Sequence, residues 1–220
     1  MFFRLIEVVL LASIAYASVV PRTSSSLSPR EVQAVDILLQ IAPTSNTCSG
    51  APVPAECATN VQAAPFLISA MQKYEIYSVP EMAAVLSVVA FETADFKYNT
   101  NKFPGRPGQG TRNMQMANYN LLYAQSIPEL ATPLSAITTS SSIAGLSDEK
   151  LNAIRALVLP DEYSWASGAW FLTTQCANIR PALQTGSRVG FGAYMGCLGV
   201  TASDDRLAYW KRATAAFSGA

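Results

Sequence analysis

The sequence predicts a mainly α-helical protein built as one domain, and three observations favour this fold class. Hydrophobic residues make up 50% of the 220-residue chain and charged residues only 14%, so the chain can bury one sizeable core. Helix-start signals recur along the sequence, whereas alternating strand patterns are few. One segment rich in Gly, Pro and Asn, residues 95–112, interrupts the helical pattern and predicts a long irregular loop or a small hairpin.

The N-terminal residues have the pattern of a secretory signal. A cation at Arg4, an apolar run over Val8–Ile14 and small residues at Ala15 and Ala17 predict a signal peptide over residues 1–17. A membrane anchor is the alternative, although the apolar run is short for a span. We therefore expect a secreted, extracellular protein with a flexible leader over residues 18–27 and a folded domain over residues 28–220.

Helix-start signals place the expected helices along the chain. The segment SPRE, Ser28–Glu31, is a capping box with proline at the first helical position, and it predicts a helix to about Ile41. A second helix is expected over Ala64–Tyr74. The segment SVPE, Ser78–Glu81, predicts a second capping box that opens a helix over Pro80–Thr93. Further helical patterns cover residues 114–126, 147–157, 161–176 and 203–217.

The four cysteines indicate two disulfides, because an even count is typical of secreted chains. Three pairings are possible. We favour the local pairs Cys48–Cys57 and Cys176–Cys197, since each pair brackets a loop-like segment. A metal site is less favoured because no C-x-x-C spacing occurs.

The chain contains no histidine, and this excludes several kinds of chemistry. A Ser-His-Asp triad, a Cys-His nucleophile and a histidine-bound zinc site are all impossible. No Walker or dinucleotide-binding fingerprint occurs, and we expect no cofactor. The net charge is zero and no run of Lys and Arg is present, so nucleic acid is not an expected partner. Carboxylates remain as the common acid–base groups.

Glu92 stands at the end of the most apolar predicted helix, and the ten residues before it carry no charge. Helical spacing places it on one face with Val85, Val88 and Val89. Burial and the negative end of the helix dipole both disfavour a carboxylate anion there, so we expect a carboxyl that can hold a proton as a general acid does. The alternative is that Glu92 marks the point where the helix surfaces, in water or paired with Lys97.

Three patches of the sequence resemble the lysozyme-like superfamily, which includes goose-type lysozymes, lytic transglycosylases and glycoside hydrolase family 19 chitinases. AFETADF at residues 90–96 is similar to the helix-end ESGF and HET segments of these enzymes. GQGTRNMQMANYN at residues 108–120 is similar to the chitinases' GRGPIQL…NYNY and to the transglycosylases' GLMQI. CLGVTASDDRLAYWKRA at residues 197–213 resembles a late chitinase helix. The patches occur in the family's order and cover roughly residues 80–125 and 190–213.

The resemblance implies one lysozyme-like helical domain that cleaves a β-1,4-linked amino-sugar polymer, either chitin-like or peptidoglycan-like. Glu92 would be the general acid, and Arg206 matches a late arginine that pairs with active-site acids in the family. The residues expected to bind substrate or to line its cleft are Gln115, Asn118, Tyr119, Tyr98 and Arg112. The implied partner is a polysaccharide, and we expect a monomer with no membrane contact after signal removal.

The sequence departs from the family pattern in lacking a second acid soon after the first. No Asp or Glu lies between Asp95 and Glu129, although inverting enzymes need a base to activate water. Asp95 could orient water or simply cap the helix end, and we assign it a supporting role. Asp161 and Glu162 are either a second catalytic pair or favourable charge in the first turn of a helix. The alternative function is therefore a secreted, non-catalytic glycan-binding or surface-acting protein on the same scaffold.

Overall fold

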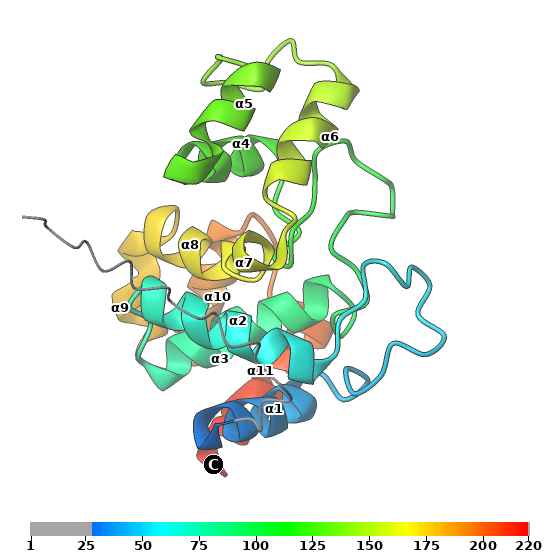
Figure 1. The fold of residues 1–220 in the computed structure, drawn as a ribbon. Coiled ribbons are helices and arrows are strands. Elements are labelled where there is room, and N and C mark those ends of the chain that lie inside the picture. The colour runs from blue at the N-terminus through cyan, green and yellow to red at the C-terminus, as the bar shows by residue number, and fades with distance from the viewer. Residues whose placement is uncertain (1–27, 220) are drawn as a thin grey trace, which may run out of the picture.

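The computed structural model describes residues 28–219, so the predicted signal peptide and leader lie outside the described residues. The mainly α-helical fold class is confirmed (Figure 1). The only strand-like pairings in the described part are isolated bridges from Gly110 to Thr100 and to Gln115. The helices are α1 (Pro29–Ile41), α2 (Asn60–Lys73), α3 (Val79–Glu92), α4 (Ala117–Gln125), η1 (Pro128–Leu130), α5 (Ala131–Ile137), α6 (Asp148–Leu157), α7 (Asp161–Ser164), α8 (Ser167–Thr174), η2 (Ala177–Ile179), α9 (Arg180–Leu183), α10 (Arg188–Cys197) and α11 (Asp204–Ser218).

Helix α3 forms the centre of the core. Every residue from Ala83 to Ala90 is buried, as its apolar sequence predicts. Helices α1, α8, α9 and α11 pack against it. At Gly168 of α8 an added Cβ would lie 3.3 Å from Val85 Cγ1 and 3.4 Å from Val89 Cγ2, so the missing side chain allows α8 to approach α3 closely. Helices α4, α5 and α6 pack on one another at the opposite end of the molecule from α1 (Figure 1).

The two predicted capping boxes have different outcomes. The one at Ser28 forms as expected, because Ser28 Oγ accepts from Glu31 N and Glu31 Oε2 accepts from Ser28 N. The one at Ser78 is wrong: Ser78 makes no side-chain cap bond. Glu81 instead lies buried and pairs with Arg180 Nε at 2.6 Å, while its second oxygen accepts from Gln184. The Glu81 side chain therefore binds Arg180, 99 residues away, instead of completing the local capping box.

Other helix boundaries also differ from the predictions. Helix α2 begins at Asn60, four residues before the predicted Ala64, because Thr59 and Gln62 form a capping box. The predicted helix over residues 161–176 is broken between α7 and α8 at Trp165 and Ala166. Helices α5, α9 and α10 were not predicted. The last of these contains the glycines of RVGFGAYMGC, which weaken the helical signal.

Both expected disulfides are confirmed. Cys48 bonds to Cys57 and Cys176 bonds to Cys197, so the chain has no free cysteine. Each bridge closes a local segment, spanning 9 and 21 residues respectively. The second bridge joins Cys176, just before η2, to the last residue of α10.

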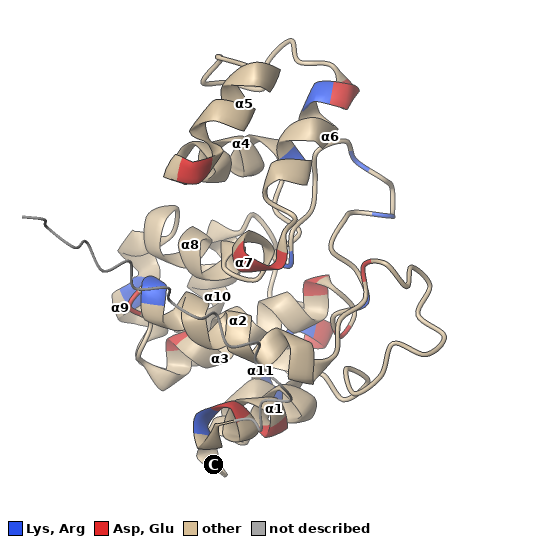
Figure 2. Ribbon diagram, viewed as in Figure 1, with Lys and Arg blue, Asp and Glu red and all other residues tan. Residues whose placement is uncertain are grey.

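Charged side chains are sparse and interspersed by sign along the described chain (Figure 2). None of the helices over residues 28–219 has the length and apolar character that a membrane span requires.

The Glu81–Arg180 pair generates a stability prediction. Glu81→Gln keeps the shape of the buried side chain but removes the charge that Arg180 needs. We expect the free energy of unfolding to fall by about 1–3 kcal/mol in urea denaturation, as for hydrogen bonds to charged groups. The matched control is Glu129→Gln at an exposed position of η1, which should change stability by less than about 0.5 kcal/mol. Equal losses in the two variants would contradict a structural role for the pair.

Candidate functional site

Glu92 is the last residue of α3, and the chain turns sharply after it. Thr93 caps the helix by donating its hydroxyl to Val89 O, and it accepts from Phe96 N. The next three residues, Ala94, Asp95 and Phe96, all have positive φ, at 49°, 56° and 70°. Left-handed backbone is unfavourable for residues other than glycine, and such strain is often found at functional sites.

The carboxylate of Glu92 forms an ion pair with Arg206 of α11. Arg206 Nη2 lies 2.9 Å from Glu92 Oε1, and the guanidinium lies 4.5 Å from the ring centroid of Phe91. The Glu92 side chain remains 24% exposed, so it is reachable from solvent. Lys97 is not its partner, because that ammonium donates to the carbonyls of Thr44 and Thr47. The partner of Glu92 within the described chain is therefore Arg206.

Glu92 lines a cavity of about 490 Å³. A second cavity of about 290 Å³ also has Glu92 and Met114 in its wall, so Glu92 borders two cavities. Tyr119 and Phe171 contribute aromatic walls to the larger cavity, and Tyr98, Phe91 and Phe103 contribute to the smaller. Carboxylate, amide and aromatic groups therefore line two cavities that share Glu92 and Met114 at the end of α3.

Three amide side chains in the larger cavity have unsatisfied acceptor oxygens. Gln109 Oε1, Asn113 Oδ1 and Gln115 Oε1 are buried and have no hydrogen-bond partner in the described residues. The amide nitrogens of two of them are occupied, since Gln109 donates to Met114 O and Gln115 donates to Asn120 Oδ1. An unsatisfied buried acceptor costs about 1–3 kcal/mol. These oxygens have almost no exposed surface, and Asn113 Oδ1 lies against Gly168 of α8, so a ligand would reach them only after the amide groups turn toward the cavity.

Backbone geometry in the loop holds these amides in place. Gly108 adopts φ +70°, and an added Cβ would lie 2.7 Å from Ala117 Cβ, so only glycine fits there. Asn120, at the start of α4, donates to the carbonyls of Gly108 and Gln115. The Gly-rich loop is thereby fixed to the helix that follows it.

Asp95 is placed away from this cavity. Its Oδ2 accepts from Thr44 N at 3.0 Å and from Thr44 Oγ1 at 2.8 Å, and its Oδ1 accepts from Tyr209 Oη at 2.8 Å. The residue is 5% exposed and lines neither cavity beside Glu92. Burial, together with Asp95, raises the pKa of Tyr209 to about 12, so the phenol stays a donor. These contacts give Asp95 a structural role that fixes the turn.

The remaining candidate residues separate into two groups. Gln115, Tyr119 and Arg206 line the larger cavity with Glu92, and Tyr98 lines the smaller one. The structure does not bring Asn118 and Arg112 to either cavity.

Asn118 and Arg112 have other surroundings. Asn118 is exposed on α4. Arg112 is buried, donates to the carbonyls of Phe96 and Tyr98, and lies 4.3 Å from the ring centroid of Trp165. Burial lowers the pKa of Arg112 to about 10. Arg112 therefore holds the loop rather than facing Glu92.

Asn113, which lines the larger cavity, and Tyr194, whose pKa the charge of Glu92 affects, were not among the predicted residues. Asn113, in the loop before α4, lines the cavity, whereas the predicted Asn118 lies on α4 and does not. Tyr194 of α10 is fully buried, and its hydroxyl has no partner in the described residues. Burial raises the pKa of Tyr194, and the charge of Glu92 raises it further, so the two side chains are electrostatically coupled. No motif marks Tyr194, because its position depends on a helix that the sequence did not predict.

No second carboxylate from the described residues lines either cavity beside Glu92. Asp161 instead accepts from Trp165 Nε1 at the start of α7, as a residue of the first helical turn. Nor do three or more Cys, Asp or Glu side chains gather into a possible metal site within residues 28–219.

Comparison with known proteins gives one partial relative. Over 158 residues the chain is 52% identical to a protein of Fusarium oxysporum (strain Fo5176) named bifunctional dioxygenase (DOX)-epoxy alcohol synthase (EAS). The match covers 71% of this chain but 12% of that protein, so the name describes a protein most of which has no counterpart here. No protein-family model matches the chain, and no solved structure matches it.

The hydrogen bonds of Asp95 generate a second stability prediction. Asp95→Asn places an amide donor opposite Thr44 or Tyr209, so the free energy of unfolding should fall by about 1–3 kcal/mol. Tyr209→Phe removes one donor and should cost about 0.5–1.5 kcal/mol. Because the two residues share a bond, the double variant should lose less than the sum of the single losses in chemical denaturation. Strict additivity would show that the bond does not contribute.

Proposed function

We propose that the protein is a secreted glycoside hydrolase that cleaves a β-1,4-linked amino-sugar polymer, with Glu92 as the general acid. The observation that carries this proposal is the position of Glu92 in one cavity with the amide side chains of Gln109, Asn113 and Gln115. Amide groups turned toward the cavity would hydrogen-bond sugar hydroxyls and the N–H of an N-acetyl group. The aromatic rings of Tyr119 and Phe171 offer apolar surface for sugar faces.

The shape of the site also supports a polymeric substrate. Glu92 also lines the smaller cavity with Tyr98 and Phe103, so each cavity offers room for a sugar unit beside this residue. Phe103 is 85% exposed, and an exposed aromatic ring beside a cavity is suited to stacking on a sugar. The zero net charge of the chain favours a neutral chitin-like polymer over an anionic cell wall.

In this mechanism the Glu92 carboxyl donates its proton to the leaving glycosidic oxygen as the bond to the anomeric carbon breaks. Arg206, at 2.9 Å, stabilises the carboxylate that remains. A water molecule from the cavity then adds to the anomeric carbon, and its proton returns to Glu92. Asp95 takes no part in these steps because its oxygens are bonded to Thr44 and Tyr209.

A second candidate is the non-catalytic glycan-binding protein. It is favoured by the absence of a second carboxylate from both cavities in the described chain, and by the ion pair that neutralises Glu92. The same amides and rings would then hold a glycan without cleaving it.

Secretion is proposed on two grounds. The first 17 residues have the pattern of a signal peptide, and both disulfides suit an oxidising compartment. The dioxygenase and epoxy alcohol synthase activities in the relative's name are not proposed for this chain, which spans 12% of that protein.

Glu92→Gln tests the catalytic proposal. It keeps the shape of the side chain but removes the transferable proton, so cleavage of chitin oligomers or peptidoglycan, followed by mass spectrometry, should slow by about 10²–10⁴-fold. Asp95→Asn is the matched control, and it should lower the cleavage rate by less than about tenfold under conditions where the variant remains folded. Full activity in the Gln variant would refute the assignment of Glu92. Glycan binding without cleavage by the unmodified protein would favour the second candidate.

A further inference from the structure

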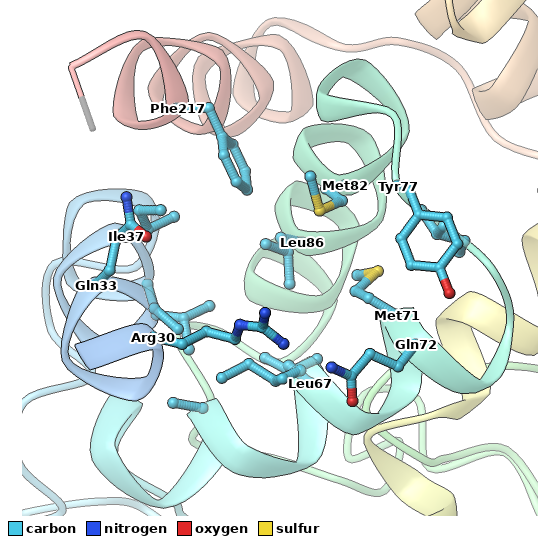
Figure 3. Close-up of a pocket in the computed structure, with 15 residues that line it drawn as sticks. Arg30, Gln33, Ile37, Leu67, Met71, Gln72, Tyr77, Met82, Leu86 and Phe217 are labelled. Atoms are coloured by element: carbon cyan, nitrogen blue, oxygen red, sulfur yellow. The ribbon is translucent and has the colours of Figure 1, made fainter. Parts of the chain in front are cut away.

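A third cavity, of about 330 Å³, lies on another part of the core among α1, α2, α3 and α11 (Figure 3). It shares no lining residue with the two cavities beside Glu92. Its walls are apolar: Leu67 and Met71 from α2, Leu86 from α3 and Phe217 from α11 direct their side chains toward one space. Its volume falls within the range of small-molecule sites, which are mostly apolar with a few placed polar groups.

The polar groups of this cavity come from Arg30, Gln33 and Gln72. In Figure 3 the guanidinium of Arg30 extends from α1 across the cavity toward the amide of Gln72. Arg30 forms no ion pair with any residue from 28 to 219, unlike Arg180 and Arg206, which pair with Glu81 and Glu92. An apolar interior therefore stands beside one cation without a carboxylate partner.

We propose that this cavity binds a small amphiphile with a single unbranched apolar chain and a carboxylate head. Each buried methylene of the chain would contribute about 0.8 kcal/mol, and the thioether of Met71 can adapt to a flexible chain. The planar guanidinium of Arg30 presents paired donors that match a carboxylate. A carboxylate head would pair with Arg30, a contact that a purely apolar ligand lacks, so charge complementarity favours the anionic amphiphile. This site goes beyond the proposed function and does not depend on it.

The test is isothermal titration calorimetry of the full chain with dodecanoate and with dodecanol, each kept below its aggregation concentration. Both should bind. Arg30→Gln, at an exposed position, should weaken the binding of dodecanoate by about fivefold, which is the upper effect of one exposed ion pair. The affinity for dodecanol should stay within about twofold of that of the unmodified chain. Ala34→Phe and Ile68→Trp each add a ring at the cavity wall. Each should weaken the binding of both ligands by about tenfold or more. Lys150→Gln on the distant helix α6 is the charge-matched control and should change neither.

Several results would overturn the proposal. One is no binding of either ligand by the unmodified chain, including the case in which residues 1–27 fill the cavity. Another is unchanged binding in ring-adding variants that circular dichroism shows to be folded. A third is an equal effect of Arg30→Gln on dodecanoate and dodecanol, a comparison that remains decisive if the ring-adding variants do not fold. Glu92→Gln should bind dodecanoate normally, which keeps this test separate from that of glycan cleavage.

Discussion

The carboxylate of Asp95 holds the turn on which the candidate site depends. Three consecutive left-handed residues follow α3, each at a cost of about 1–2 kcal/mol. Three hydrogen bonds to Asp95 and the packing of Phe96 against Trp165, with ring centroids 5.1 Å apart, offset that cost. Because the helix must stop there, Glu92 becomes its last residue and faces open space, while the neighbouring acid is buried on the other side.

The loop that follows is held by buried polar contacts rather than by regular structure. Arg112 binds the carbonyls of Phe96 and Tyr98 from inside the protein. Glu56 accepts from Thr100 and pairs with Lys102 at 2.6 Å. Burial alone would raise the pKa of Glu56, but bonds from Lys102, Thr100 and Asn99 outweigh it and lower that pKa. These contacts keep the amide side chains of the loop beside Glu92.

Local patterns were the predictable part of this protein. The apolar run of α3, the capping box at Ser28 and the loop-bracketing cysteines each depend on neighbours in sequence, and the structure agrees with all three. The capping box at Ser78 failed because Glu81 has a stronger partner in Arg180, far along the chain. Asn113, rather than the predicted Asn118, lines the cavity with Glu92. Which amide side chain faces the cavity depends on backbone turns such as the one at Gly108, and amino-acid composition does not reveal these turns.

Helix α11 packs against both α1 and α3, and α1 and α11 lie side by side in Figure 1. The core that begins with residues 29–41 is therefore closed by residues 204–218. During synthesis on the ribosome, the apolar face of α1 and much of α3 would stay uncovered until the last of these segments has emerged, which exposes the nascent chain to aggregation. The two disulfides close earlier and shorter loops, so both can form before that final step.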